Sequence, residues 1–420
     1  MTHPGPRTVL VTGPGGAGRT TVAAATALAA ARGGERALLL SGEPEARLAA
    51  LLGTAPPAWP AAPAAAAHGL RAVRVDSAAR FRAGALALQR HGSAALDALG
   101  AVPLDDDELT ELPGAGELAL LHAMGAAHGS REWDLLVVDL PPAADAVRML
   151  ALPGQLRRYL RRLLPPERRT ARALRPLLAQ LAGVPMPAQG LYEAAGRLDA
   201  SLAAVQAVTE HPGTAVRLVA EPEAGAVAAL RTVRAGLALH GLRAGPVVAN
   251  RVLPAGSGDP WLASAAARQR TALEDLARLA APECGRSDEA PKDVRELPHL
   301  GREVSGPGDL GLLAELAGPA HPQGPPGPAV RPGELPVDDR LARDGTLVWR
   351  LPLPGAVREE LDLVRRGDEL VVTVGPFRRV LELPPVLRRC TVTGAGLRGG
   401  ALAVRFAPDP GLWPAGTAGT

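Results

Sequence analysis

The segment Thr8–Thr21, with the sequence TVLVTGPGGAGRTT, decides the fold of this chain. Residues 8–12 are β-branched or aliphatic and predict a short buried strand. Residues 13–18 form a glycine-rich loop, and the Ala-rich stretch 21–32 after it favours a helix. A second apolar run, 37–40, comes next. This order of strand, loop, helix and strand is typical of the first unit of a parallel α/β domain.

The glycine-rich loop has the spacing of a P-loop, G-x-x-x-x-G-[K]-[ST], at every position except the lysine. Gly13 and Gly18 take the two glycine positions, and Thr20 takes the position of the Mg²⁺-binding hydroxyl. Glycines let backbone N–H groups turn inward on a phosphate, and the N-terminus of the following helix favours the anion. Arg19 keeps the lysine's charge but presents a wide, planar group. The loop therefore predicts binding of a di- or triphosphate, with a glycine-rich connector that binds nothing as the alternative.

Later apolar runs predict the rest of the sheet. Residues 135–139, 216–220 and 247–250 are short and aliphatic on both faces, as strands between two helical layers must be. We expect a doubly wound, mostly parallel α/β domain over residues 1–317. Within it, residues of about 151–205 form a helical insert.

The composition changes at Gly318. Residues 318–336 are too rich in Pro and Gly to pack and predict a semi-rigid linker. Residues 337–410 then predict a small all-β sandwich, followed by a tail at 411–420. The expected strands of this sandwich are 346–351, 369–374, 379–383, 390–393 and 401–406.

Composition argues against several classes of function. The formal charge of +3 is small for 420 residues, so no nucleic-acid partner is expected. Cys284 and Cys390 are the only cysteines, and their separation predicts neither a zinc pair nor a disulfide framework. The first residues lack the charged start and apolar stretch of a signal peptide. The longest apolar run, 22–31, is about half of what a bilayer crossing requires. We expect a cytoplasmic protein.

Five segments in order resemble the ArsA/guided-entry ATPases, the family of arsenite-pump and tail-anchored-protein-targeting ATPases. The segments are GPGGAGRTT (13–21), LLSGEP (39–44), LLVVDLPPAADAVRMLALP (135–153), TAVRLVAEPE (214–223) and VVANRVLP (247–254). The first resembles that family's deviant P-loop GKGGVGKTT, and the last resembles its VVVNRVLP. The C-terminal β domain resembles the small heat-shock-like module appended to many ArsA-type proteins. The resemblance covers nearly the whole chain.

The resemblance implies ATP and Mg²⁺ as cofactors. It implies that Asp139 and Thr20 hold Mg²⁺, with Asp139 acting through water, and that Asn250 hydrogen-bonds adenine. Glu43 takes the position of the aspartate that orients the attacking water, so Glu43 and Arg19 are the candidate catalytic residues. The residues expected to line the phosphates are Gly13, Gly15, Gly16, Ala17, Gly18, Arg19, Thr20 and Thr21. The alternatives are that Asp139 only forms a turn and that Asn250 only caps a strand.

Three positions depart from the family's pattern, and all three weaken catalysis. Pro14 replaces the signature lysine that reaches across the dimer, and proline has neither a donor nor a charge. Arg19 and Glu43 alter the other two chemical positions. Phosphoryl transfer depends on placed charges and an oriented water. We therefore expect ATP binding with weakened hydrolysis.

The resemblance also implies a dimer that closes on nucleotide and couples closure to a client, either a protein or a membrane protein. The dimer is a homodimer or a heterodimer with an ArsA-like paralogue that retains its own signature lysine. Two other functions stay open: a non-catalytic nucleotide-binding subunit, and a chaperone-like interaction protein driven by the β domain. Arsenite transport finds no support, because two distant cysteines cannot form a three-sulfur site.

The stretch 157–175 carries eight arginines against the single acid Glu167. A solvated helical face is the favoured interpretation, since such charge runs usually face water. An anionic membrane surface or an acidic partner helix is the alternative.

Overall fold

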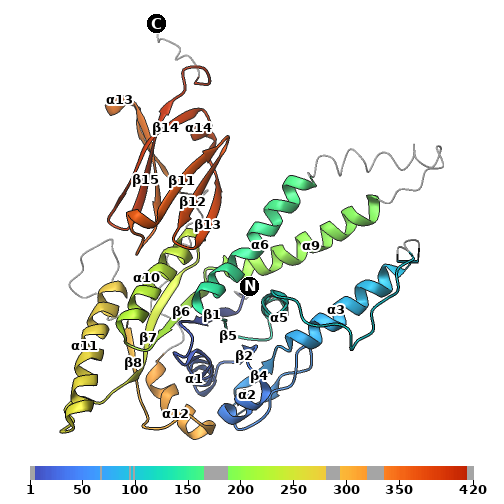
Figure 1. Ribbon diagram of the computed structural model, residues 1–420, viewed down its shortest axis with the longest axis vertical. Coiled ribbons are helices and arrows are strands. Elements are labelled where there is room, and N and C mark those ends of the chain that lie inside the picture. The colour runs from blue at the N-terminus through green and yellow to red at the C-terminus, as the bar shows by residue number, and fades with distance from the viewer. Residues whose placement is uncertain are drawn as a thin grey trace.

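Figure 1 shows the computed structural model of the chain, in which an α/β domain carries a separate β domain at one end. The structure describes residues 5–66, 69–93, 96–97, 100–164, 188–280, 294–318 and 335–413. Among these residues, no helix combines the length and the apolar character that a membrane crossing needs.

An eight-stranded sheet forms the centre of the α/β domain, in the order β3-β4-β2-β5-β1-β6-β7-β8. Seven of its strands are parallel, and only β3 pairs antiparallel, with β4. The strands are β1 (Arg7–Thr12), β2 (Ala37–Ser41), β3 (Ala64–Ala65), β4 (Arg71–Arg74), β5 (Leu135–Asp139), β6 (Thr214–Ala220), β7 (Ala244–Val252) and β8 (Val294–Pro298). The doubly wound, mostly parallel fold is confirmed, and the first strand predicted from the sequence lies at its centre.

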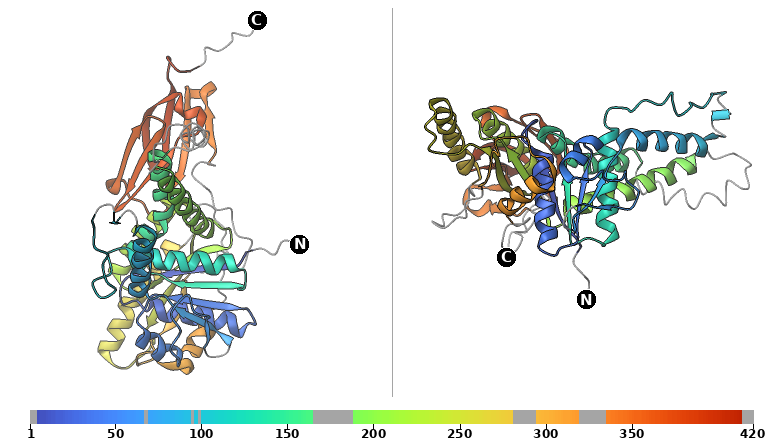
Figure 2. Two further views of the ribbon diagram at one scale, coloured as in Figure 1. Left: turned by 90° about the vertical axis from the view of Figure 1, so that its right-hand side faces the viewer. Right: turned by 90° about the horizontal axis from the view of Figure 1, so that it is seen from below.

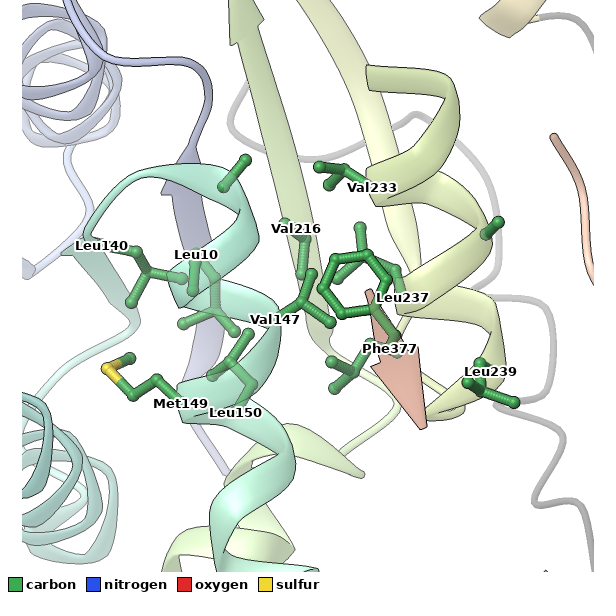
Figure 3. Packing of buried hydrophobic residues seen from close by; sticks show 14 of the residues in the cluster. Leu10, Leu140, Val147, Met149, Leu150, Val216, Val233, Leu237, Leu239 and Phe377 are labelled. Atoms are coloured by element: carbon green, nitrogen blue, oxygen red, sulfur yellow. The ribbon is translucent and has the colours of Figure 1, made fainter. Parts of the chain in front are cut away.

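Helices cover both faces of the sheet, and the packing of β1 explains why its central residues, 9–11, are all apolar. Val9 and Val11 pack on one face with α1 (Arg19–Arg32), α2 (Glu45–Leu52) and α12 (Gly306–Ala317). Leu10 packs on the other face, because successive side chains of a strand point in opposite directions. That face carries α5 (Ala115–Ser130), α6 (Ala143–Leu163), α9 (Ala188–Thr209), α10 (Ala224–Leu239) and α11 (Pro260–Ala280). Figure 3 shows Leu10 beneath Val147 and Leu150 of α6.

The helical region expected at 151–205 begins earlier than predicted, because α6 starts at Ala143, directly after the segment that ends β5. The centre of that region, 165–187, lies outside the described residues. Together with α3 (Ser77–His91), α9 extends beyond the sheet on one side of the domain (Figures 1 and 2).

The β domain contains a four-stranded sheet, β14-β15-β10-β9, and a three-stranded sheet, β11-β12-β13. Both are antiparallel. Its elements are β9 (Val337–Arg340), α13 (Leu341–Asp344), β10 (Thr346–Pro352), η3 (Arg358–Glu360), β11 (Leu361–Arg366), β12 (Glu369–Val374), β13 (Phe377–Glu382), α14 (Pro385–Arg388), β14 (Cys390–Arg398) and β15 (Ala401–Pro408). All five predicted strands are present, and β9 and β11 are additional. Most of the predicted linker, 319–334, lies outside the described residues.

The β domain packs against α10 through a close aromatic contact. A Cβ atom added at Gly236 of α10 would lie 2.4 Å from the Phe377 ring, so glycine is what lets the ring approach the helix. Figure 3 shows this ring beside Leu237. Arg379 Nη1 also donates to Leu239 O, at the end of α10, over 2.8 Å.

A second contact joins the β domain to α6. Arg158 forms two hydrogen bonds of 2.8 and 2.7 Å with the two carboxylate oxygens of Glu369 on β12. Arg157, next to it, binds Asp199 of α9. The interpretation of a solvated arginine face is therefore wrong for Arg157 and Arg158, because each forms an ion pair with an acidic residue that is distant in sequence.

Candidate functional site

The predicted site residues meet at the carboxyl edge of the parallel strands. The glycine-rich loop joins β1 to α1, Asp139 ends β5, Glu43 follows β2, and Asn250 lies near the end of β7. In open parallel sheets this edge is where ligands bind. The structure thus brings together predicted site residues from four separate segments of the sequence.

Two glycines of the loop are required by close contacts with neighbouring strands. A Cβ at Gly13 would lie 1.9 Å from Val219 O of β6, and a Cβ at Gly18 would lie 2.3 Å from Asn250 Nδ2. Gly18 also has a φ of +85°, a left-handed conformation that side chains disfavour. These positions therefore shape the loop and hold it against β6 and β7.

The opposite side of the loop is open. A Cβ at Gly15 or Gly16 would meet no atom within 4 Å. The helix α1 starts at Arg19, and its N-cap residue Gly18 provides no side-chain cap, so no side chain satisfies the first amides of the helix in this way. Free amides and the helix dipole make such a terminus a binding site for anions.

Asp139 is buried, with 5% of its surface exposed, and its two oxygens differ. Oδ2 accepts a hydrogen bond of 2.8 Å from Ser41 Oγ, whereas Oδ1 is buried without a hydrogen-bond partner among the described residues. Burial raises the pKa of Asp139 to about 6, although the hydroxyls of Ser41 and Thr20 and the charge of Arg19 act to lower it. A buried carboxylate with an unpartnered oxygen favours a cation nearby.

The residues present fit Mg²⁺. The Thr20 side chain is also buried, and its hydroxyl lies close enough to Asp139 to lower the pKa of that carboxyl. A carboxylate and a hydroxyl are oxygen ligands of the kind that Mg²⁺ prefers, with waters and phosphate oxygens completing its shell. Asp139 and Thr20 would hold the ion when it binds.

Arg19 connects the loop to the segment after β5. Its Nη1 donates a hydrogen bond to Leu140 O. A lysine at this position would present one compact ammonium group, whereas the guanidinium carries several donors in a plane. In this structure Arg19 therefore binds a backbone carbonyl directly beside the Mg²⁺-site candidate Asp139.

A cavity of about 300 Å³ opens beside these residues. Its polar lining comprises Arg19, Glu43, Ser77, Glu117 and Asp139. Sequence analysis missed Ser77 and Glu117, which lie in the first turns of α3 and α5. Neither belongs to a motif, so only the packing of the two helices against the sheet identifies them.

Glu43 lines the same cavity, but its carboxylate is already engaged. Oε2 accepts a hydrogen bond of 2.9 Å from Arg47 Nη1, one turn later in the chain. The Glu43 backbone N–H is 3.2 Å from Ser41 Oγ, the same hydroxyl that binds Asp139. The catalytic role of Glu43 stays a prediction, and in this structure Arg47 holds one of its two carboxylate oxygens.

Asn250 contacts the glycine-rich loop itself. It is 5% exposed, and its Nδ2 donates a hydrogen bond of 2.9 Å to Ala17 O. The neighbouring Arg251 donates to Gly16 O over 3.0 Å. Arg251 was not predicted as a site residue, although it lies in the segment VVANRVLP. The adenine contact of Asn250 stays a prediction.

Other ligand chemistry has less support. Among the residues that the structure describes, no group of three or more His, Cys, Asp or Glu side chains is placed to hold a metal ion. Cys390 is a buried free thiol, and Cys284 lies outside the described residues.

Comparison with known proteins agrees with the arrangement of the two domains. Residues 6–316 match the profile of the anion-transporting ATPases, and residues 344–406 match that of the HSP20-like domain found in ArsA. A Streptomyces coelicolor protein, described as uncharacterized, is 55% identical over 98% of this chain and 100% of its own length. A Mycobacterium tuberculosis protein is 33% identical, with 97% of each chain covered. An Aquifex aeolicus protein whose assigned name is that of an arsenical pump-driving ATPase is 25% identical, over 91% of this chain and 95% of its own.

Proposed function

This chain belongs to the anion-transporting ATPase (ArsA) family and carries the family's HSP20-like domain, and from that premise we propose that it binds ATP with Mg²⁺ and hydrolyses it slowly. The observation that supports this most strongly is the pairing of an open, uncapped glycine-rich loop with a buried carboxylate that leaves one oxygen unpartnered. The first suits phosphates, and the second suits the cation that accompanies them.

The chain's own groups have distinct parts in this proposal. Loop amides and the start of α1 bind the phosphates, and Thr20 and Asp139 hold Mg²⁺, which neutralises phosphate charge when bound. Ser41 Oγ holds the Asp139 carboxylate in place from one side. Arg19 Nη1 is held by Leu140 O, so a phosphate bound by the remaining guanidinium donors would be linked to the position of residue 140.

Two features support slow hydrolysis in this proposal. Glu43 is paired with Arg47, so orienting a water costs the separation of an ion pair. Pro14 offers no donor where the family's signature lysine lies. Catalysis of phosphoryl transfer depends on groups placed in advance, and these two are not placed for it.

Two assays test the proposal together. Addition of ATP and Mg²⁺ should raise the midpoint of thermal unfolding of the full chain, and phosphate release should stay low. Thr20→Val, which removes the hydroxyl but keeps the volume, should lose the Mg²⁺-dependent part of the stabilisation. Arg268→Ala, an exposed change on α11, serves as the control. Rapid phosphate release that depends on Thr20 would contradict the proposal that hydrolysis is slow.

We further propose that nucleotide binding closes a dimer and that closure is coupled to a protein or membrane-protein client. The loss of the signature lysine at Pro14 favours a heterodimer with a paralogue that retains the lysine, in which this chain is a nucleotide-binding subunit with little activity of its own. Phosphate release by the paralogue, measured with and without this chain, tests the idea. Binding of unfolded clients without nucleotide would instead favour the chaperone-like function of the β domain.

A further inference from the structure

Two consecutive residues near the end of β7 both bind the glycine-rich loop. Asn250 Nδ2 donates to Ala17 O, and Arg251 Nη1 donates to Gly16 O, over 2.9 and 3.0 Å. In a regular strand, consecutive side chains point to opposite faces of the sheet. Contact of both with one loop therefore requires a break in the strand geometry.

The break is at Arg251, which has a φ of +59°. A left-handed conformation at a non-glycine residue costs free energy and points to a functional constraint. The pairing of β7 with β8 also shifts in register between Ala249 and Val252. The irregular backbone rotates residue 251, so that its side chain points toward the loop as the Asn250 side chain does.

Neighbouring elements hold Arg251 in this conformation. Gln269 of α11 donates to Arg251 O over 3.2 Å and accepts a hydrogen bond of 2.8 Å from Leu253 N. Glu221, just after β6, accepts a hydrogen bond of 3.2 Å from Arg251 Nη1. Gln269 thus holds the backbone of Arg251, and Glu221 holds its guanidinium group beside the loop carbonyl.

We propose that Arg251 is a positioning residue that acts with Asn250 to orient the loop's peptide groups for phosphate. In a trans peptide the C=O and N–H groups point in opposite directions, so a donor on the carbonyl fixes the amide. Arg251 binds the Gly16 carbonyl and so fixes the peptide between Gly16 and Ala17. The N–H of that peptide donates to Pro14 O at 3.4 Å and closes a turn. Asn250 fixes the next peptide and turns the Gly18 N–H away from β7, toward the open side of the loop.

This inference deepens the proposed nucleotide site and rests on it for its effect on ligands, but its structural part can be tested without nucleotide. In the full chain free of nucleotide, Arg251→Ala should speed hydrogen exchange of the amides in residues 13–18, while exchange in the core of α1 stays unchanged. Its affinity for ATP with Mg²⁺ should fall by about fivefold, the loss expected for one hydrogen bond of ordinary strength. Arg251→Lys, which retains one charged donor, should recover part of both losses, and Arg268→Ala should change neither.

The outcomes separate the two ideas. Wild-type exchange in residues 13–18 of Arg251→Ala would overturn the role of Arg251, whatever the protein binds. Should wild-type protein fail to bind ATP while the exchange difference persists, the proposed function fails and the positioning role stands. If Arg251→Ala does not fold, Glu221→Gln tests the same contact, because it removes the anionic partner that orients the guanidinium. Unchanged loop exchange in that variant would overturn the proposal.

Discussion

Replacement of Asp139 by Asn should stabilise the nucleotide-free protein while abolishing its response to Mg²⁺ and ATP. Burial raises the pKa of this carboxyl from its ordinary 3.8 to about 6. The unfolded chain therefore ionises at a lower pH than the folded chain, and folded stability falls as the pH rises from about 4 through 6. Above pH 6, the loss of folding free energy caused by the buried, ionised carboxylate is complete. It amounts to about 3 kcal/mol, because the pKa rises from 3.8 to about 6 and each tenfold change in a proton equilibrium corresponds to about 1.4 kcal/mol.

The amide of Asp139→Asn carries no charge, so the variant does not bury an ionised group. The amide oxygen can still accept the hydrogen bond from Ser41. Part of the gain is lost because the new NH₂ group is buried without an identified acceptor, which costs about 1–2 kcal/mol. We expect a net gain of about 1–2 kcal/mol at pH 7.5. The gain should be about 1.4 kcal/mol smaller at pH 5, where the folded wild-type carboxyl is protonated.

Urea unfolding at pH 5 and pH 7.5, without nucleotide, measures both quantities. Addition of ATP and Mg²⁺ should then raise the midpoint of the wild type but leave that of the variant unchanged. The reasoning is refuted if the variant is less stable than the wild type at pH 7.5, or if its advantage is independent of pH. A variant that keeps the full response to Mg²⁺ and ATP would show that Asp139 is not a ligand of the ion.

Two further changes follow from the packing and the ion pairs. Gly236→Ala should destabilise the protein by about 2 kcal/mol in a urea titration, because its Cβ would collide with the Phe377 ring at 2.4 Å. Gly225→Ala, on the same helix but in open space, is the matched control and should stabilise by about 0.5 kcal/mol; equal effects at both sites would argue against the close contact. Arg47→Ala should raise the steady-state rate of phosphate release by about twofold, because it frees Glu43 from a largely exposed ion pair worth about 0.5 kcal/mol. A rate at or below that of the wild type would show that Glu43 does not act in hydrolysis.

The central strands and the loop could be predicted from the sequence because local pattern and tertiary environment agree there. β1 and β5 are buried on both faces, so each contains a continuous apolar run, 9–11 and 135–138, that no helix period explains. The glycines of the loop could be predicted from the P-loop spacing, and in the structure Gly13 and Gly18 are required by close contacts with Val219 O and Asn250 Nδ2.

Strands at the edges could not be predicted, because their environment places few demands on the sequence. β8 is an edge strand with the sequence VRELP, and most of its residues are partly or fully exposed. β4, which lies next to the two-residue edge strand β3, begins and ends with arginine, and the edge strand β9 contains two aspartates and an arginine. Such strands lack the apolar pattern on which the predictions rest.

The distant residues that charged side chains contact in the fold could not be predicted from the sequence either. Arg158 lies in a run of arginines, and nothing local indicates that Glu369 lies opposite it in the fold. The role of Arg251 depends on a left-handed backbone conformation that sequence favours only at glycine or asparagine. Both residues show that a charge is interpretable only when its distant partner is known.

The most direct test of this account is a calorimetric titration of the full chain with ATP in the presence and absence of Mg²⁺. Saturable binding is expected at one site per chain, tightened by Mg²⁺, with the Mg²⁺-dependent gain lost in Thr20→Val. Absence of binding at millimolar ATP, or binding that is indifferent to both Mg²⁺ and Thr20, would contradict it.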